Sequence, residues 1–178
     1  TNLDGKADKV EILLKGLRSP NGVAYRQGEL FVAEIEKVSR LSNADDDTKD
    51  EMKFESLPQS FPRDQHHGVK FIRFGPDGWL YVPVGANCNV CDLGIDVGSD
   101  KNEVVAEGVR NTVGFDWNPK NKELWFTDNG RDLMGDDVPP DEVNKLSRKG
   151  EHFGFPFCHG KSVEDPQFKK SCKDLTPP

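Results

Sequence analysis

Three stretches of the chain alternate apolar and polar residues in a pattern that predicts β-hairpins. Each consists of a short strand-like run, a polar turn and a second run, and they span residues 22–34, 71–84 and 114–127. The turns carry Gly28, the sequence Gly-Pro-Asp-Gly from Gly75, and Asn-Pro-Lys-Asn from Asn118. Glycine, proline, asparagine and aspartate favour tight turns, so each stretch is expected to fold back on itself.

The spacing between these hairpins is nearly regular. The leucine that opens each second run recurs after 50 and then 44 residues, at Leu30, Leu80 and Leu124. A repeat of this length is typical of a β-propeller, in which small antiparallel sheets, the blades, surround a central axis. The sequence therefore predicts an all-β fold, a partial β-propeller of about three four-stranded blades in a single domain over residues 1–178.

Shorter apolar runs beside the hairpins predict the outer strands of the blades. They lie at residues 10–14, 38–41 and 103–106. The acidic run at residues 43–51 predicts an exposed loop. The tail at 161–178 has little strand signal and is expected to be irregular, and no stretch shows the period of an amphipathic helix.

Three blades are too few for a closed ring, because a propeller has about four to eight. An open arc would leave sheet faces and strand edges exposed to water. Two interpretations follow. Either the chain is part of a longer protein, or a partner chain completes the ring.

The charge of the chain excludes some classes of partner. The formal net charge is −7 and the pI is about 5.1, whereas nucleic acids and anionic membranes attract clustered Lys and Arg. No apolar run has the length that crosses a bilayer, so membrane insertion is not expected. The first residues, Thr1 to Lys6, do not resemble a signal peptide, which a mature chain would already have lost.

The four cysteines form two local pairs, Cys88 with Cys91 and Cys158 with Cys172. The even count favours two disulfides and an oxidising location, such as the periplasm or the exterior of the cell. A single zinc site with four thiolates is the alternative. Zinc sites of this kind usually combine two short, similar Cys-x-x-Cys units, and the second pair here is spaced too widely for that pattern.

Two polar clusters precede predicted hairpins, where loops approach the axis of a propeller. The first contains His66 and His67, and neutral histidine is a competent base near neutral pH. The second contains Arg110, whose planar fork suits a carboxylate or quinone oxygen, and Asn111, a neutral donor and acceptor. The alternative interpretations are two surface histidines and a turn arginine paired with a nearby acid.

A third cluster is the acidic loop at residues 128–144, which contains six carboxylates, two glycines and two adjacent prolines. Calcium prefers carboxylate and carbonyl oxygens. Two ligand sets are therefore candidates: the main-chain carbonyls of Gly130 and Arg131, or the side chains of Asp136, Asp137, Asp141 and Glu142. The alternative is a solvated acidic loop without a metal.

Other reaction classes lack their motifs in this sequence. No Gly-x-Ser-x-Gly elbow, dinucleotide glycine motif, phosphate-binding loop or His-Glu-x-x-His zinc motif occurs. Cys88 and Cys91 could form a redox pair, but thioredoxin-like motifs sit at a strand-to-helix junction that this sequence does not offer.

Five motifs, taken together, resemble the sorbosone dehydrogenase branch of the sugar dehydrogenases that depend on pyrroloquinoline quinone. The resemblance runs from about Gly16 to Gly160, and its motifs lie at residues 66–85, 108–117, 124–132, 135–144 and 152–160. These enzymes are related to soluble glucose dehydrogenase, a six-bladed propeller. The resemblance implies hydride transfer from a sugar hydroxyl or an aldehyde hydrate to the quinone, with calcium polarising the quinone carbonyl.

The resemblance also assigns roles to residues. It implies that His67 is the catalytic base, since it lies eight positions before the Gly-Pro-Asp turn, and that His66 is not. It places Arg110 and Asn111 against the quinone and the sugar. It moves the calcium contacts from the acidic side chains to the carbonyls of Gly130 and Arg131.

The chain departs from this family in three respects. The position of an aspartate that assists the base in the glucose enzymes falls near Ala86. The segment between Cys91 and Glu103 is shorter than expected. The later blades, which supply basic residues to the cofactor carboxylates, have no counterpart. The leading hypothesis is therefore an exported quinoprotein sugar or aldose dehydrogenase, of which the chain is expected to form the N-terminal half. The rival is a non-catalytic, propeller-derived binding or structural module completed by a partner chain.

Overall fold

The structure is a computed structural model that describes residues 4–45, 52–91, 103–168 and 170–175. Within these ranges the chain forms thirteen short strands and a single 3-10 turn, η1 (Cys172–Asp174). The strands are β1 (Gly22–Arg26), β2 (Glu29–Ala33), β3 (Lys37–Ser42), β4 (Lys53–Ser60), β5 (Arg73–Phe74), β6 (Leu80–Tyr81), β7 (Ala106–Glu107), β8 (Phe115–Trp117), β9 (Leu124–Asp128), β10 (Glu142–Lys145), β11 (Glu151–His152), β12 (Cys158–His159) and β13 (Val163–Glu164). This confirms the predicted all-β class.

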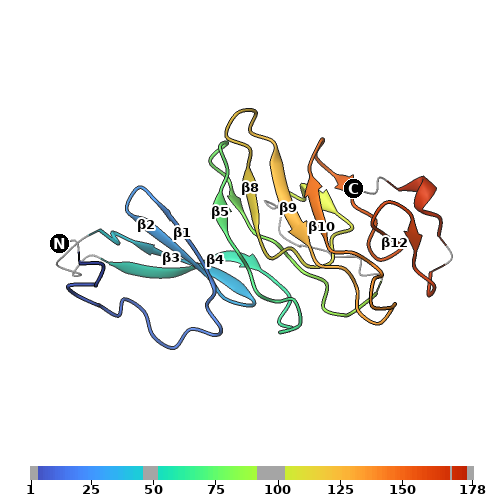
Figure 1. Ribbon diagram of the computed structural model, residues 1–178. Coiled ribbons are helices and arrows are strands. Elements are labelled where there is room, and N and C mark those ends of the chain that lie inside the picture. The colour runs from blue at the N-terminus through green and yellow to red at the C-terminus, as the bar shows by residue number, and fades with distance from the viewer. Residues whose placement is uncertain (1–3, 46–51, 92–102, 169, 176–178) are drawn as a thin grey trace.

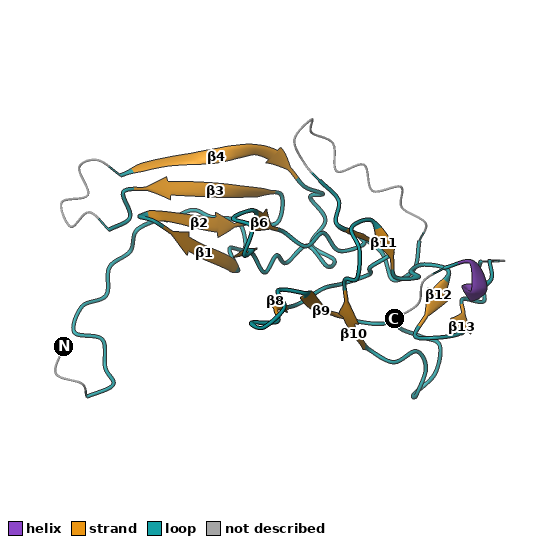
Figure 2. Ribbon diagram, turned by 90° about the horizontal axis from the view of Figure 1, so that it is seen from above, coloured by secondary structure: helices purple, strands orange, loops and turns teal. Residues whose placement is uncertain are grey.

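The sheets follow one another along the molecule in chain order (Figure 1). β1 to β4 form a four-stranded antiparallel meander. β5 pairs with β6, β8 to β10 form a three-stranded sheet, and β12 pairs with β13, all antiparallel. Figure 2 shows the four-stranded sheet at one end, with β12 and β13 at the other. The arrangement is a partial β-propeller.

All three predicted hairpins are present. In the first, Gly22 lies opposite Ala33; in the second, Arg73 opposite Tyr81; in the third, Phe115 opposite Phe126. The first blade has the expected four strands, whereas the described residues supply two strands to the second and three to the third.

Several elements differ from the prediction. Residues 10–14 form no strand, and Val10 is 84% exposed. The strand expected at 103–106 is reduced to β7, which pairs in parallel with β11. β4 was not predicted, and β10 begins inside the acidic loop because Glu142 pairs with Asp128. β13 and η1 lie in the tail expected to be irregular. Most of the predicted loop at 43–51 and the whole of the shortened segment between Cys91 and Glu103 lie outside the described residues.

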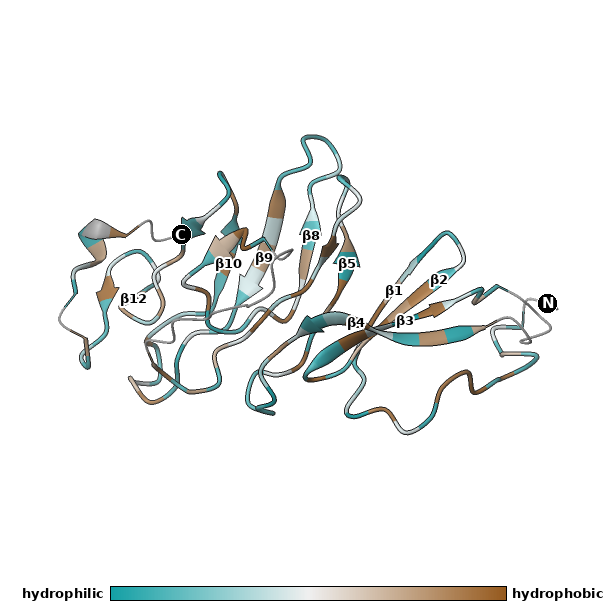
Figure 3. Cartoon of the chain, turned by 180° about the vertical axis from the view of Figure 1, so that it is seen from behind, coloured by the Kyte–Doolittle hydropathy of each residue, from teal (hydrophilic) through white to brown (hydrophobic). Residues whose placement is uncertain are grey.

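Two apolar clusters join neighbouring blades. The first packs Phe31 and Val38 of the first blade against Ile72 and Phe74, and the rings of Phe31 and Phe74 meet edge to face at 5.1 Å. The second gathers side chains of the second and third blades around Phe126, namely Tyr81, Phe115, Trp117, Leu124 and Phe153. Figure 3 shows hydrophobic stretches on β2 and β9 beside hydrophilic turns. These contacts fix each hairpin against the next and set the positions of the loops that link them.

Both cysteine pairs form disulfides, as the local pairing predicts. The Cα atoms are 6.1 Å apart in Cys88–Cys91 and 5.3 Å apart in Cys158–Cys172. Among the described residues, none belongs to a helix long and apolar enough to cross a membrane.

Candidate active site

Ala86 brings the histidine cluster and the arginine cluster together. Its carbonyl oxygen lies 2.7 Å from Nδ1 of His67, and its N–H donates to the carbonyl oxygen of Arg110 at 2.8 Å. Gly85 permits the approach, because a Cβ there would lie 2.6 Å from both Cβ and the carbonyl oxygen of His67. The two loops, 43 residues apart in sequence, therefore meet at one short backbone segment.

The hydrogen bond to Ala86 determines the tautomer of His67. A carbonyl oxygen only accepts, so Nδ1 carries the proton and Nε2 of the neutral ring is left as a proton acceptor. The backbone of His67 has φ +52°, a left-handed conformation that a non-glycine residue adopts only where its surroundings impose it. The ring is therefore held by its hydrogen bond to the carbonyl of Ala86 and by the constrained backbone of His67 itself.

The surroundings of His67 also favour the neutral ring. Burial lowers the pKa of His67 below its usual value of 6.5, and the positive charge of Arg110 acts in the same direction. The hydrogen bond to Ala86 and the charge of Asp132 oppose this shift. His66 is exposed, and its ring lies 3.9 Å, centroid to centroid, from that of His67. Of the two histidines, His67 is thus the half-buried one, and its ring is fixed by a hydrogen bond.

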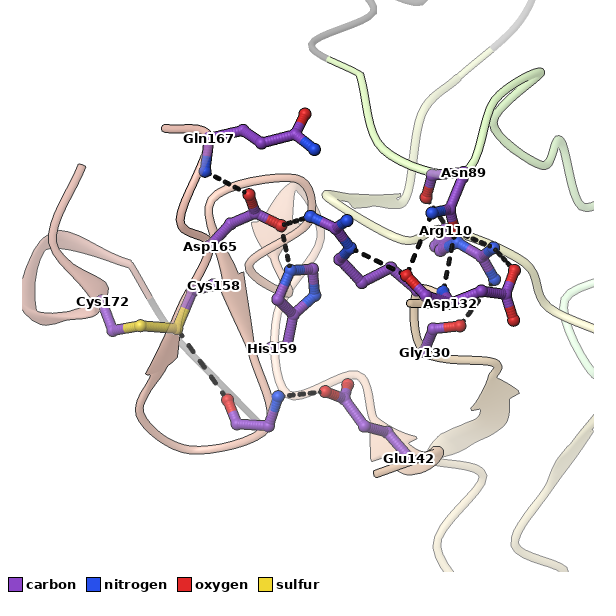
Figure 4. A network of polar contacts seen from close by, with 12 residues as sticks. Asn89, Arg110, Gly130, Asp132, Glu142, Cys158, His159, Asp165, Gln167 and Cys172 are labelled. Carbon is purple, nitrogen blue, oxygen red and sulfur yellow. Dashed lines mark hydrogen bonds and ion pairs between the residues drawn. A yellow bond between two sulfur atoms is a disulfide. The ribbon is translucent and has the colours of Figure 1, made fainter. Parts of the chain in front are cut away.

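Arg110 is buried, and its guanidinium donates five hydrogen bonds to protein oxygens. Nε binds the carbonyl of Asn89 at 2.8 Å, and Nη2 binds Oδ1 of Asn89 at 3.0 Å and Oδ2 of Asp132 at 3.1 Å. Nη1 binds the carbonyls of Asn129 and Gly130 at 3.1 and 2.7 Å. A guanidinium has five N–H groups, so every donor of this fork is engaged. Figure 4 shows Arg110 among Asn89, Gly130 and Asp132.

Asp128 anchors the backbone of the arginine cluster. Its carboxylate accepts the N–H of Arg110 at 3.0 Å and that of Asn111 at 2.6 Å. Burial raises the pKa of Asp128 to about 7, and the charge of Glu142 on the facing strand adds to the rise, while the two N–H groups oppose it. Asn111 is thus positioned through its main chain and lies next to Arg110.

In the acidic loop, some carboxylates are exposed to solvent and others accept hydrogen bonds from backbone N–H groups. Asp136 and Asp137 are exposed. Asp141 accepts the N–H of Gly130 at 2.9 Å, and Glu142 accepts the N–H of Gly160 at 2.5 Å. Asp141 and Glu142 therefore shape the loop through its own backbone and that of the following segment.

Arg131 belongs to a second buried network. Its Nη1 donates to Oδ2 of Asp165 at 2.6 Å, and the same oxygen lies 2.9 Å from Nε2 of His159 (Figure 4). Burial raises the pKa of Asp165, but the hydrogen bonds from Arg131 and His159 outweigh it, and the pKa ends below its usual value. This network links Arg131, near the start of the acidic loop, to Asp165 in the tail.

Five residues of these networks were not predicted as site residues: Asn89, Asp128, Asp132, His159 and Asp165. Asn89 lies between Cys88 and Cys91, and only the folded structure reveals that it faces Arg110. Asp132 and His159 fall within motifs that carry the family resemblance, which was a usable signal. Asp165 lies in the tail, where nothing in the sequence pattern marks it.

The residues do not fit a calcium ion in their present arrangement. The carbonyl oxygen of Gly130, one of the two expected ligands, accepts a hydrogen bond from a guanidinium, and that positive charge repels a second cation. Within the described ranges, no three His, Cys, Asp or Glu side chains gather as a metal cluster. The engaged donors of Arg110 likewise leave none for a quinone oxygen. The expected contacts of both groups require a different position of Arg110.

Comparisons with known sequences identify the family of the chain. Residues 1–149 match the family described as Domain of unknown function (DUF7133), and the chain belongs to this family. An uncharacterized protein of Borreliella burgdorferi is 32% identical, in a match that covers 90% of this chain and 47% of that protein.

Solved structures of similar fold include a carbohydrate-active enzyme and two dehydrogenases. A Trichoderma reesei structure of Carbohydrate-Active Enzymes Family AA12 has a TM-score of 0.64 at 16% identity, over 78% of this chain and 44% of that one. The holo PQQ domain of Coprinopsis cinerea pyranose dehydrogenase has a TM-score of 0.59 at 13% identity, over 81% and 44%. A glucose dehydrogenase has a TM-score of 0.53 at 17% identity, over 80% and 50%. The chain spans about half the length of the relatives it matches, and at these identities the likeness shows the fold alone.

Proposed function

We propose that this chain carries the proton-accepting part of the active site of a sugar or aldose dehydrogenase related to the sorbosone dehydrogenase branch. The reaction would be the oxidation of a sugar hydroxyl or an aldehyde hydrate. The observation that carries the proposal is the hydrogen bond of 2.7 Å between Nδ1 of His67 and the carbonyl oxygen of Ala86. It presents Nε2 as a fixed base at the place where the resemblance expects one.

Each feature around His67 supports proton transfer from a hydroxyl. A lowered pKa keeps the ring neutral, and therefore able to accept a proton, at neutral pH. The positive charge of Arg110, which acts on His67, would also favour the negative charge that develops on the substrate oxygen as its proton leaves. The resemblance expects an aspartate near Ala86 to support the base, and here the main-chain carbonyl of Ala86 supplies that support.

The electron acceptor in the proposal is pyrroloquinoline quinone with calcium, which would take the hydride. The support is the likeness in fold to a PQQ domain and the motifs of the sequence. We propose that binding of this cofactor requires Arg110 to leave the Gly130 carbonyl, together with further blades that close the ring. The two disulfides are compatible with a secreted or periplasmic location, because such bonds persist in oxidising compartments.

A second candidate function is a non-catalytic binding or structural module. The engagement of all five Arg110 donors with protein oxygens favours it, because this arrangement leaves the fork without a free donor for a ligand. In that case the loops persist as structural connections, and a partner chain covers the open faces.

Dye reduction separates the two candidates. The chain, together with the further blades or the partner chain that close the ring, is purified and incubated with pyrroloquinoline quinone and calcium, and reduction of an electron-accepting dye is followed with a panel of aldoses. If the protein is a dehydrogenase, we expect turnover that depends on the sugar. His67→Ala should abolish this turnover, while cofactor binding, measured by calorimetry, should persist. His66→Ala is the matched control and should retain most of the activity. Absence of cofactor binding at micromolar concentrations would favour the module, and a larger loss in His66→Ala would refute the assignment of the base.

A further inference from the structure

Asn89 occupies the centre of the polar network beside His67. It lies in the four-residue ring closed by the Cys88–Cys91 disulfide. Its Oδ1 accepts hydrogen bonds from Nη2 of Arg110 at 3.0 Å and from the N–H of Asp132 at 2.7 Å. Its Nδ2 donates to the carbonyl of Asp132 at 3.1 Å, and its own carbonyl accepts from Nε of Arg110 at 2.8 Å. One residue thus holds two segments that lie far apart in sequence.

These bonds determine where the charge of Arg110 lies. Asn89 accepts two of the five guanidinium bonds, and Asp132, which accepts a third, is itself held by Asn89. Replacement of Asn89 by Ala would keep the main-chain carbonyl that accepts Nε but remove Oδ1, which leaves one N–H of the buried Nη2 without its partner and disfavours the present position of the side chain. Arg110 would then be held less firmly in its present position.

We infer that Asn89 is a positioning residue that holds Arg110 beside His67, and that the Cys88–Cys91 disulfide keeps Asn89 in that place. The inference rests on the proposed function only for its catalytic meaning; the positioning itself is a property of the folded chain. The ring restricts the backbone of Asn89 from both sides, so opening it releases the carbonyl and the side chain together.

The two disulfides differ in access. Cys88 and Cys91 are half-buried, whereas Cys158 is 1% and Cys172 is 7% exposed. Thiol exchange requires direct attack on a sulfur atom, so a dithiol reductant should open the first ring before the second bond. One dithiol loses two electrons and becomes a disulfide, while the Sγ–Sγ bond of Cys88 and Cys91 breaks to give two thiols. The site would therefore loosen under reducing conditions.

Two spectroscopic readouts test the inference without turnover. Hydrogen exchange of the Asp132 amide reports its bond to Oδ1 of Asn89, and the NMR titration of His67 reports the proximity of the Arg110 charge. The samples are the oxidised chain, the chain treated with a dithiol, Cys88→Ser with Cys91→Ser, Asn89→Ala and Asn89→Asp. Asn121→Ala, in an exposed turn of the third blade, is the control for loss of an asparagine.

Asn89→Ala, the double serine variant and the reduced chain should each lose Asp132 amide protection by about tenfold or more, since its partner is gone or mobile. In the same samples the pKa of His67 should rise towards 6.5. Asn89→Asp keeps the acceptor oxygen and should restore most of the protection, while Asn121→Ala should match the parent chain.

Unchanged protection in Asn89→Ala would overturn the positioning role. Unchanged protection on reduction, with loss in Asn89→Ala, would overturn the role of the disulfide. Neither result depends on activity, so failure of the proposed function is distinguishable from failure of this inference.

Discussion

The Nη1 atom of Arg110 lies 2.7 Å from the carbonyl oxygen of Gly130. The same nitrogen also binds the carbonyl of Asn129, so the guanidinium supplies positive charge to consecutive oxygens of the loop that follows β9. A calcium ion on Gly130 would have to share that oxygen with a fixed cation. The two therefore compete, and the position of Arg110 decides which of them the loop accepts.

Removal of the guanidinium should increase the affinity of the chain for calcium. Two positive charges about 4 Å apart repel by roughly 4 kcal/mol per unit charge at an effective dielectric constant near 20, so Arg110→Gln should bind calcium about tenfold more tightly or better. Calorimetric titration with calcium checks this, with circular dichroism to confirm that the variant is folded. Arg73→Gln removes an exposed arginine on β5 and should leave the affinity unchanged. Weaker calcium binding in Arg110→Gln would show that Arg110 supports the metal site instead of competing for it.

Gly85 should be intolerant of a side chain because of its contact with His67. A Cβ there would lie 2.6 Å from Cβ and from the carbonyl oxygen of His67, neither of which is the flexible end of a side chain. Gly85→Ala should therefore displace His67 and lower the free energy of unfolding by about 1–3 kcal/mol. Urea denaturation and the NMR signal of the His67 ring measure the two effects. Gly114→Ala has no atom within 4 Å of the added Cβ and should be neutral or slightly stabilising; equal effects at both positions would refute the steric explanation.

The hairpins were predictable because their determinants are local. In 71–84 and 114–127 the turn residues and the flanking apolar runs lie within a few positions of one another, and both stretches form the expected strand pairs. The strand expected at 10–14 depends on a neighbour, which its own sequence does not specify. The same reason explains β10, whose pairing with β9 overrides the loop-like composition of the acidic stretch.

The site was predictable only in part. Residue type was sufficient to select His67 and Arg110 as candidates. Their connection runs through the backbone of Ala86, where the identity of the side chain carries no information about a main-chain hydrogen bond. The role of Asn89 likewise follows from long-range packing of the second and third blades, and no spacing rule predicts that contact.

Asp165 should contribute strongly to stability because it is the buried partner of Arg131. The two side chains are 0% and 6% exposed, and their ion pair spans 2.6 Å. Asp165→Ala would leave a buried guanidinium without its carboxylate and should cost about 3 kcal/mol or more of the free energy of unfolding. Asp116→Ala breaks an ion pair with Arg73 whose side chains are 61% and 49% exposed, and it should cost no more than about 1 kcal/mol. Similar urea midpoints for the two variants would contradict this difference.

Lys70 should make the stability of the chain rise with pH in the alkaline range. Its side chain is 1% exposed, its Nζ donates to the carbonyl of Gly68 at 3.0 Å, and burial lowers its pKa from 10.5 to about 8. Below pH 8 the ammonium is charged in both the folded and the unfolded chain, so the cost of burying the charge is present in full. Between about pH 8 and 10.5 the folded chain releases this proton while the unfolded chain keeps it, and the free energy of unfolding therefore increases with pH.

The gain across this window should be about 2 kcal/mol once partial hydration of the ammonium is allowed for. Urea denaturation at pH 7.5, 8.5 and 9.5 measures it. Lys70→Met has no proton to release and should flatten the slope, whereas Lys120→Met, at an exposed turn, should keep the slope of the parent chain. A slope that persists in Lys70→Met would assign the pH dependence to another group. A different contradiction would be a fall in stability from pH 7.5 to 9.5 that Lys70→Met abolishes. The pKa of Lys70 would then be raised in the folded chain, and the buried ammonium would stabilise the fold.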